Sequence, residues 1–76
     1  MKDDEIVQSI LIDKSVYSKS QAKKLLIELG FVSTFEESEN TQYYRARQID
    51  PKNVKKSSFR TWYSIPGVKL ITGKIK

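Results

Sequence analysis

Only one segment of this chain has the pattern of an amphipathic helix, and it limits the fold more than any other feature. Ser18 and Gln21 have the spacing of a capping box, in which each side chain bonds the backbone amide of the other residue. Apolar residues then recur with helical spacing up to residue 29. Gly30 is predicted to take the left-handed conformation that ends a helix, with Phe31 packing back against the last turn. The stripe consists of Ala22, Leu25, Leu26 and Leu29. So short a helix cannot bury this stripe alone, so we expect it to lie on a sheet.

Residues 5–13 are predicted to form the first strand. Their β-branched content favours a strand, although a short helix also fits the spacing of the apolar residues. As a strand, the segment would be apolar on both faces, which is typical of a central position in a sheet. One face would carry Ile6, Ile10 and Ile12, and the other Val7 and Leu11.

Three more strands are expected after the helix, separated by turns. They cover residues 41–49, 59–64 and 68–75. Pro51 predicts a turn over residues 50–53, and Pro66 and Gly67 fit the two central positions of a type II turn. Residues 32–40 are expected to be a loop or a weak edge strand.

These elements predict a single domain over residues 1–76. Its fold class would be α+β, with one helix packed on a small, mostly antiparallel sheet in the order β-α-β-β-β. A domain of this size buries a thin core, so self-association, for example as a homodimer, is one open source of further stability.

The composition excludes several kinds of site. The chain has no cysteine and no histidine, which removes disulfides, Ser-His-Asp and Cys-His catalysis, and structural zinc sites. Its three glycines are isolated, so no phosphate-binding loop is present. We therefore expect no catalytic residue, no cofactor and no metal, and a protein that is not an enzyme. The spacing of a calcium-binding loop is absent from the acidic residues Glu36, Glu37, Glu39 and Asp50, which are interpreted as solvated.

The charges are divided unequally between the two halves of the chain. Residues 1–40 carry five lysines against eight acidic residues, a net charge of −3, and residues 41–76 carry nine basic residues against one aspartate, a net charge of +8. Such an asymmetry indicates an anionic partner for the second half. The alternative is that the two halves pack together and partly neutralise each other.

The basic half suggests a nucleic-acid interface. In strands, alternate residues share a face, which groups Tyr43 with Arg45 and Arg47, and Arg60 with Trp62. If these two rows were neighbours, guanidinium groups that can bind phosphates would lie beside aromatic rings on which unpaired bases can stack. The candidate nucleic-acid-binding residues are Tyr43, Arg45, Arg47, Lys52, Lys55, Lys56, Arg60, Trp62 and Lys69.

Two other interpretations of the same residues remain open. The aromatic residues could belong to the core, with the arginines simply solvated. Trp62, Tyr63 and Arg60 could instead anchor a protein–protein contact, because Trp, Tyr and Arg are the residues that most often dominate such interfaces. The partner would then be a protein, and this chain would be a minor virion component or an inhibitor of a host protein.

Three segments of the second half resemble a small domain of tailed phages and other large double-stranded DNA viruses. These segments are Tyr-Arg-Ala-Arg-Gln-Ile-Asp-Pro at 44–51, Lys-Ser-Ser-Phe-Arg-Thr at 56–61 and the glycine-led strand at 67–74. The resemblance covers residues 6–76, and Trp62 and Tyr63 depart from it. It implies a viral accessory protein in the cytoplasm of a host cell or in the virion. The longest apolar run is three residues, so no membrane span is expected.

Overall fold

The computed structural model describes residues 5–35 and 42–76, and these residues form one α+β unit. The predicted fold class and the order β-α-β-β-β along the chain are confirmed, with two short 3₁₀ turns inserted between the second and third strands. The elements are β1 (Glu5–Asp13), α1 (Lys19–Glu28), β2 (Tyr43–Arg47), the 3₁₀ turns Pro51–Asn53 and Lys56–Ser58, β3 (Arg60–Tyr63) and β4 (Val68–Lys74).

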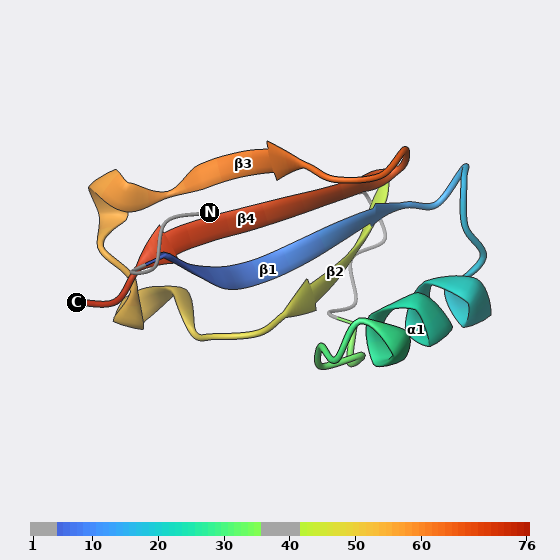
Figure 1. Cartoon of the computed structure of the whole chain (residues 1–76), viewed down its shortest axis with the longest axis horizontal. Helices are drawn as coiled ribbons and strands as arrows, with labels where there is room; N and C mark the ends of the chain where they lie inside the picture. Colours follow the sequence, from blue (N-terminus) through green and yellow to red (C-terminus); the bar gives the residue numbers. More distant parts are fainter. Residues whose placement is uncertain (1–4, 36–41) are drawn as a thin grey trace.

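The four strands form one sheet in which β1 and β4 are central and β2 and β3 are the edges (Figure 1). The spatial order is β2-β1-β4-β3, which differs from the order in the sequence, and all neighbours are antiparallel. β1 takes a central place because it is apolar on both faces, as the sequence predicts. The two strands that carry the three arginines are therefore as far apart as the sheet allows.

A β-bulge at Gln8 changes which residues of β1 face the helix. Val7 pairs with Thr72 and Ser9 with Ile71, so Gln8 is an extra residue without a partner on β4. A bulge reverses the alternation of side chains beyond it. Val7 therefore packs against the core together with Ile10, and the expectation that Val7 lies on the opposite face is wrong. The same reversal puts Ile6 on the face away from the core.

The bulge also explains why β2 ends before the predicted limit at residue 49. The backbone amides of Gln48 and Ile49 both donate to the carbonyl oxygen of Gln8, at 2.8 and 3.2 Å. The side chain of Gln8 donates in turn to the carbonyl oxygen of Ile49, at 2.7 Å. These bonds replace the regular ladder, so β2 is five residues long. Thr41, the predicted start of this strand, lies outside the described residues.

The predicted helix caps are confirmed at both ends. The Gln21 amide donates to the Ser18 hydroxyl at 3.2 Å, and the Ser18 amide donates to Oε1 of Gln21 at 2.9 Å, which completes the capping box. At the other end, Gly30 has a φ of 82°, and the amide of Phe31 donates to the carbonyl oxygen of Leu26. This is the bond of a Schellman motif.

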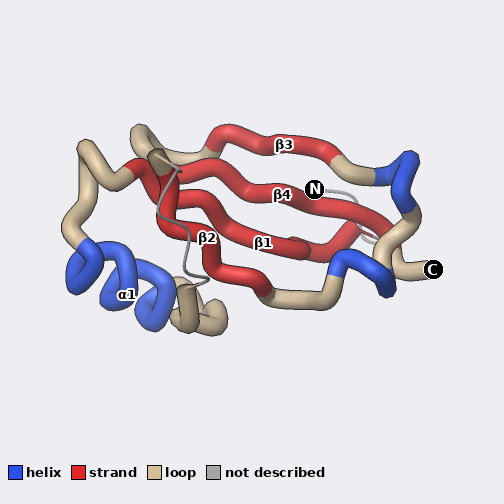
Figure 2. The backbone as a smooth tube through the Cα atoms, turned by 180° about the vertical axis from the view of Figure 1, so that it is seen from behind, coloured by secondary structure: helices blue, strands red, loops and turns tan. Residues whose placement is uncertain are grey.

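The helix packs against one face of the sheet, here called the helix face. It lies beside β2, near the end of the sheet where β1 ends and β2 begins (Figure 2). Its buried residues meet apolar residues of β1, β2 and β4; this core consists of Ile10, Ile12, Ala22, Leu26, Ala46 and Val68. Leu29, the last member of the predicted stripe, is 56% exposed. The chain that leaves the helix is fixed by the side chain of Gln48. Its Oε1 accepts from the amide of Val32 at 2.8 Å, and its Nε2 donates to the carbonyl oxygen of Val32 at 2.9 Å. Residues 32–35 form a loop, as expected, and residues 36–40 lie outside the described part.

The predicted turns agree with the structure. Val68 donates its amide to the carbonyl oxygen of Ile65 at 2.9 Å, and Gly67 has a φ of 85°. These are the features of a type II turn with Pro66 and Gly67 at its centre. Pro51 begins the first 3₁₀ turn, where the Asp50 carboxylate accepts from the Lys52 amide at 2.9 Å.

We expect Gly73→Ala to destabilise the fold, because a Cβ at this position would collide with the buried side chain of Val54. Overpacking of this kind costs about 1–3 kcal/mol, which urea unfolding would measure. Val54→Ala removes the colliding methyl groups. The double variant should therefore lose less stability than the two single losses added together. Strictly additive losses would contradict the predicted collision.

Candidate nucleic-acid interface

The face of the sheet opposite the helix, here called the open face, gathers basic and aromatic side chains from three strands. Directly paired residues of antiparallel strands point to the same face. The pairing Arg45–Leu11–Lys69–Tyr63 runs across the whole sheet, and the next such row begins with Arg47. Tyr43, paired with Asp13, belongs to the same face. Arg45 and Arg47 are exposed, and no described α-helix lies on this side (Figure 2).

Lys69 is the centre of this group. Its ammonium nitrogen lies 4.7 Å from the ring centroid of Tyr43 and 5.4 Å from that of Tyr63, so it interacts with both rings as a cation. Hydrogen bonding to the Tyr43 side chain is the largest cause that holds the pKa of Lys69 above its ordinary value of 10.5. Lys69 therefore remains a cation throughout the physiological range, and it joins two edge strands that do not touch each other.

Asp13 is the one carboxylate on the open face among the described strand residues. The Ser15 hydroxyl donates to its Oδ1 at 2.7 Å and the Ser15 backbone amide at 2.8 Å. These two bonds, the hydroxyl first, hold the pKa of Asp13 below its ordinary value of 3.8, with smaller contributions from Gln42 and Lys69. The side-chain amide of Gln42 donates to the other carboxylate oxygen, Oδ2, at 3.3 Å, so three hydrogen bonds hold Asp13 at the end of β1.

A shallow pocket of about 350 Å³ opens beside Lys69. The β3–β4 turn forms one wall, since the amide of Asp13 donates to the carbonyl oxygen of Gly67 at 2.8 Å and holds the turn against β1. The lining residues are Asp13, Tyr43, Tyr63, Ser64, Ile65, Pro66, Gly67, Val68 and Lys69. The pocket combines the rings of two tyrosines with one cation, Lys69, and one carboxylate, Asp13.

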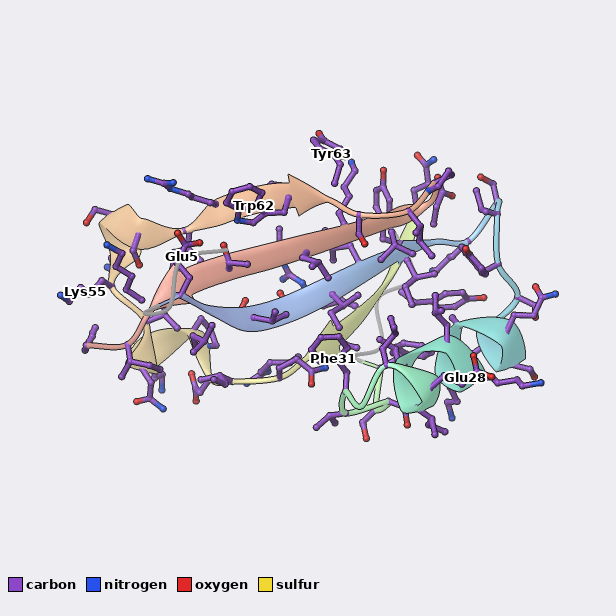
Figure 3. All side chains as sticks on the ribbon, in the orientation of Figure 1. Glu5, Glu28, Phe31, Lys55, Trp62 and Tyr63 are labelled. Carbon is purple, nitrogen blue, oxygen red and sulfur yellow. The ribbon has the colours of Figure 1, made fainter. Side chains whose placement is uncertain are left out.

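The structure does not bring together the two predicted rows of Arg and aromatic residues. Arg60 pairs with Thr72 and Trp62 with Leu70, residues of the helix face, so both point away from Arg45 and Arg47. β3 and β2 also lie at opposite edges of the sheet. The expectation that these rows are neighbours is therefore wrong, because the chain places β1 and β4 between them. Figure 3 shows Trp62 on the side of the sheet that also carries Glu5 and Phe31.

The predicted lysines of the connecting segment form a second basic group at the end of the sheet remote from α1. Lys52, Lys55 and Lys56 are exposed on or beside the two 3₁₀ turns. Lys55 is tied to β4, because its amide donates to the carbonyl oxygen of Lys74 at 2.9 Å. The nine predicted residues thus divide between the open face, the helix face and this end.

Tyr63 is the residue of the open face that the sequence analysis assigned only to protein contact. It is 77% exposed, and it joins Tyr43 through Lys69 although 20 residues separate the two tyrosines in the chain. No pattern in the sequence predicts the register of β3 on β4, which pairs Tyr63 with Lys69.

The described residues contain no group of three or more acidic, histidine or cysteine side chains able to hold a metal ion. The predicted acidic cluster at residues 36, 37 and 39 lies outside the described part. In the part of the chain that the structure describes, no helix has the length and apolarity to cross a membrane.

Comparisons with known proteins found no matching family model, no similar curated protein and no similar solved structure. The resemblance to a domain of phages and large DNA viruses therefore stays a prediction.

Tyr43→Phe should lower the pKa of Lys69 toward 10.5, because it removes the hydroxyl that bonds the ammonium group. A folded-state pKa above the unfolded value means that this contact stabilises the fold below the unfolded pKa, and that the contribution disappears as the pH rises through the raised pKa. An NMR titration of the Lys69 side chain measures the change. Tyr63→Phe is the matched control and should have a smaller effect on this pKa, since it keeps the ring and Tyr63 does not raise the pKa through a hydrogen bond to Lys69. An unchanged pKa in Tyr43→Phe would refute the assignment.

Proposed function

We propose that this protein binds single-stranded nucleic acid across the open face of its sheet. The observation that carries the proposal is the position of Lys69 between the rings of Tyr43 and Tyr63, on the face that also bears Arg45 and Arg47. Cations and flat rings on one exposed sheet surface are what a strand of unpaired nucleotides requires.

The arginines supply phosphate contacts. Arg45 and Arg47 lie two residues apart on β2, which places their Cα atoms about 7 Å apart. This spacing is close to that of successive phosphates in an extended strand, and each guanidinium can bind a phosphate with two parallel hydrogen bonds. Lys69 adds a third positive charge toward the middle of the sheet. The net charge of +5 adds a long-range attraction for any polyanion, which speeds association.

The tyrosines favour unpaired bases over a duplex. Tyr63 exposes most of its surface, and a base can stack on such a ring only when it is not enclosed in a double helix. Each base stacked on an aromatic side chain contributes about 1–3 kcal/mol of binding free energy. Stacking is tolerant of base identity, so binding across the open face is expected to show weak sequence preference.

Tyr63→Ala should weaken binding to a short single-stranded oligonucleotide by roughly 5- to 150-fold, the equivalent of one lost stacking contact. Because this side chain is highly exposed, the fold should survive its removal. Arg45→Ala and Lys69→Ala should each weaken binding to all sequences alike and make the dependence of log K on log salt shallower by about 0.7 for each lost phosphate contact. Fluorescence anisotropy at several salt concentrations measures both quantities.

Lys23→Ala is the matched control, since Lys23 is an exposed lysine on α1 rather than on the open face. It removes the same unit of charge, and it should change affinity much less than Lys69→Ala. Equal effects of the two substitutions would mean that only net charge attracts the oligonucleotide. The absence of any binding by the wild-type protein at low salt would end the proposal.

A protein partner is the second candidate, and an apolar groove favours it. The groove has a volume of about 210 Å³ between α1 and the β3–β4 turn, with Leu29 and Phe31 on one side, Ile65 on the other, and core residues as its floor. Leu29 and Ile65 are 56% and 44% exposed, and Trp62 on the same face is 39% exposed. Apolar side chains grouped in this way are typical of protein contacts.

If a second copy of the chain fills the groove, light scattering should show a mass that rises with concentration. Leu29→Gln should abolish this rise, because it puts a polar side chain into the apolar wall. Leu29 does not line the pocket beside Lys69, so the substitution should leave oligonucleotide binding across the open face intact. A monomeric wild-type protein at all concentrations would remove self-association from consideration.

A further inference from the structure

A second pocket, here called the end pocket, lies at the end of the sheet remote from α1. Its volume is about 280 Å³, near the lower limit of small-ligand sites. Its lining residues are all polar or charged: Glu5, Lys55, Ser57, Ser58, Arg60 and Lys74. Figure 3 shows Glu5 and Lys55 at this end of the sheet. The end pocket shares no lining residue with the pocket beside Lys69, so the two are separate.

Hydrogen bonds to β4 fix the backbone of the two cations Lys55 and Arg60. The amide of Lys55 donates to the carbonyl oxygen of Lys74 at 2.9 Å. The hydroxyl of Ser58 donates to the carbonyl oxygen of Lys55 at 2.6 Å and accepts from the amide of Lys74 at 2.9 Å. Arg60 pairs with Thr72 in the antiparallel ladder of β3 and β4. Both cations therefore extend from anchored backbone, unlike lysines on a loose surface loop.

Three donor groups that line the end pocket lack an acceptor. They are the guanidinium of Arg60, the ammonium of Lys55 and the hydroxyl of Ser57. In the part of the chain that the structure describes, these three side chains make no hydrogen bond and no ion pair. Hydrogen bonds from guanidinium and ammonium groups to anionic oxygens are among the strongest in proteins. An oxyanion in the pocket can therefore accept from groups that the protein leaves unused.

The carboxylate of Glu5 does not compete for these donors. Its Oε2 accepts from the hydroxyl of buried Thr72 at 3.1 Å, and its Oε1 is buried. Lys74 is the direct partner of Glu5 across β1 and β4, and opposite charges on directly paired residues attract and offset each other. The charges of Arg60 and Lys55 then remain for a ligand.

We propose that the end pocket binds a phosphate group, held by the guanidinium of Arg60, the ammonium of Lys55 and the hydroxyl of Ser57. A phosphate monoester carries a charge of about −1.5 to −2 near neutral pH and three acceptor oxygens. Its charge matches the two cations, and its oxygens match the three kinds of donor. The planar guanidinium can bond two of these oxygens in parallel. This site has no residue of the open face, and it does not depend on the binding of single strands.

Titration with inorganic phosphate at constant ionic strength, followed by NMR, tests the site directly. Saturable shifts are expected at the backbone amides of Lys55 and Ser57 and at the side-chain Nε–H of Arg60. Arg60→Ala and Lys55→Ala should each raise the Kd for phosphate roughly tenfold or more, as expected for the loss of hydrogen bonds to a charged group. Shifts that do not saturate, or that appear equally at lysines all over the molecule, would overturn the proposal.

Two further variants separate a built site from general positive charge. Lys56→Ala removes one charge from the same segment, but Lys56 is exposed and does not line the end pocket. It should leave the Kd nearly unchanged, and a loss as large as that of Lys55→Ala would mean that the proposal is wrong. Arg60→Lys keeps the charge without the fork and should fall between wild type and Arg60→Ala. These side chains are exposed, so all variants should keep the fold, which the same spectra report.

The phosphate can belong to a small free compound or to the end of a strand. Hexathymidylate with and without a 5′-phosphate distinguishes the two by fluorescence anisotropy. For a strand end, the phosphorylated form should bind roughly tenfold more tightly, Arg60→Ala should remove this advantage, and Arg45→Ala should weaken both forms alike. For a free compound, inorganic phosphate should saturate the end pocket while both hexanucleotides bind equally. If neither hexanucleotide binds at all, the single-strand proposal fails, and the phosphate titration still decides the end pocket.

Discussion

The antiparallel pairing of β1 with both β2 and β4 sets the arrangement of every other element of the sheet. β1 can occupy the centre because it has apolar side chains on both faces. Hydrogen bonds to β1 then set the registers of β2 and β4. Those registers decide which side chains share a face. Lys69 meets Tyr43 and Tyr63 because β1 and β4 together bring the two edges within reach of one lysine.

The bulge at Gln8 divides the sheet into two regions with different chemistry. On one side of it, the helix face is apolar and receives α1. Beyond it, the reversed alternation turns Val7 and Glu5 toward that same face, so a carboxylate lies within hydrogen-bond distance of Thr72. Without the extra residue, Glu5 would point to the open face, and the Thr72 hydroxyl could not donate to its carboxylate.

The helix and the turns could be predicted because their causes are local. The capping box at Ser18, the Schellman motif at Gly30 and the type II turn at Gly67 each depend on residues within a few positions of one another. The candidate site was predicted less well. The grouping of Tyr43, Arg45 and Arg47 needed only the two-residue period of a strand, whereas the separation of Arg60 and Trp62 from them depends on strand order and on the bulge.

Residue patterns along the chain were enough to predict the fold class, the positions of the elements and the basic, aromatic character of the second half. The composition also shows that the chain lacks the histidine and cysteine side chains that many catalytic and metal sites use. Three features depend on contacts between distant parts of the chain: the division of the cations between the open face, the helix face and the end remote from α1, the contact of Tyr63 with Tyr43 through Lys69, and the burial of Glu5, whose Oε1 accepts no hydrogen bond from the described residues. The physical reason is that strand order and register are set by pairings between residues up to 69 positions apart, as Glu5 and Lys74 are, and no local pattern in the chain encodes them.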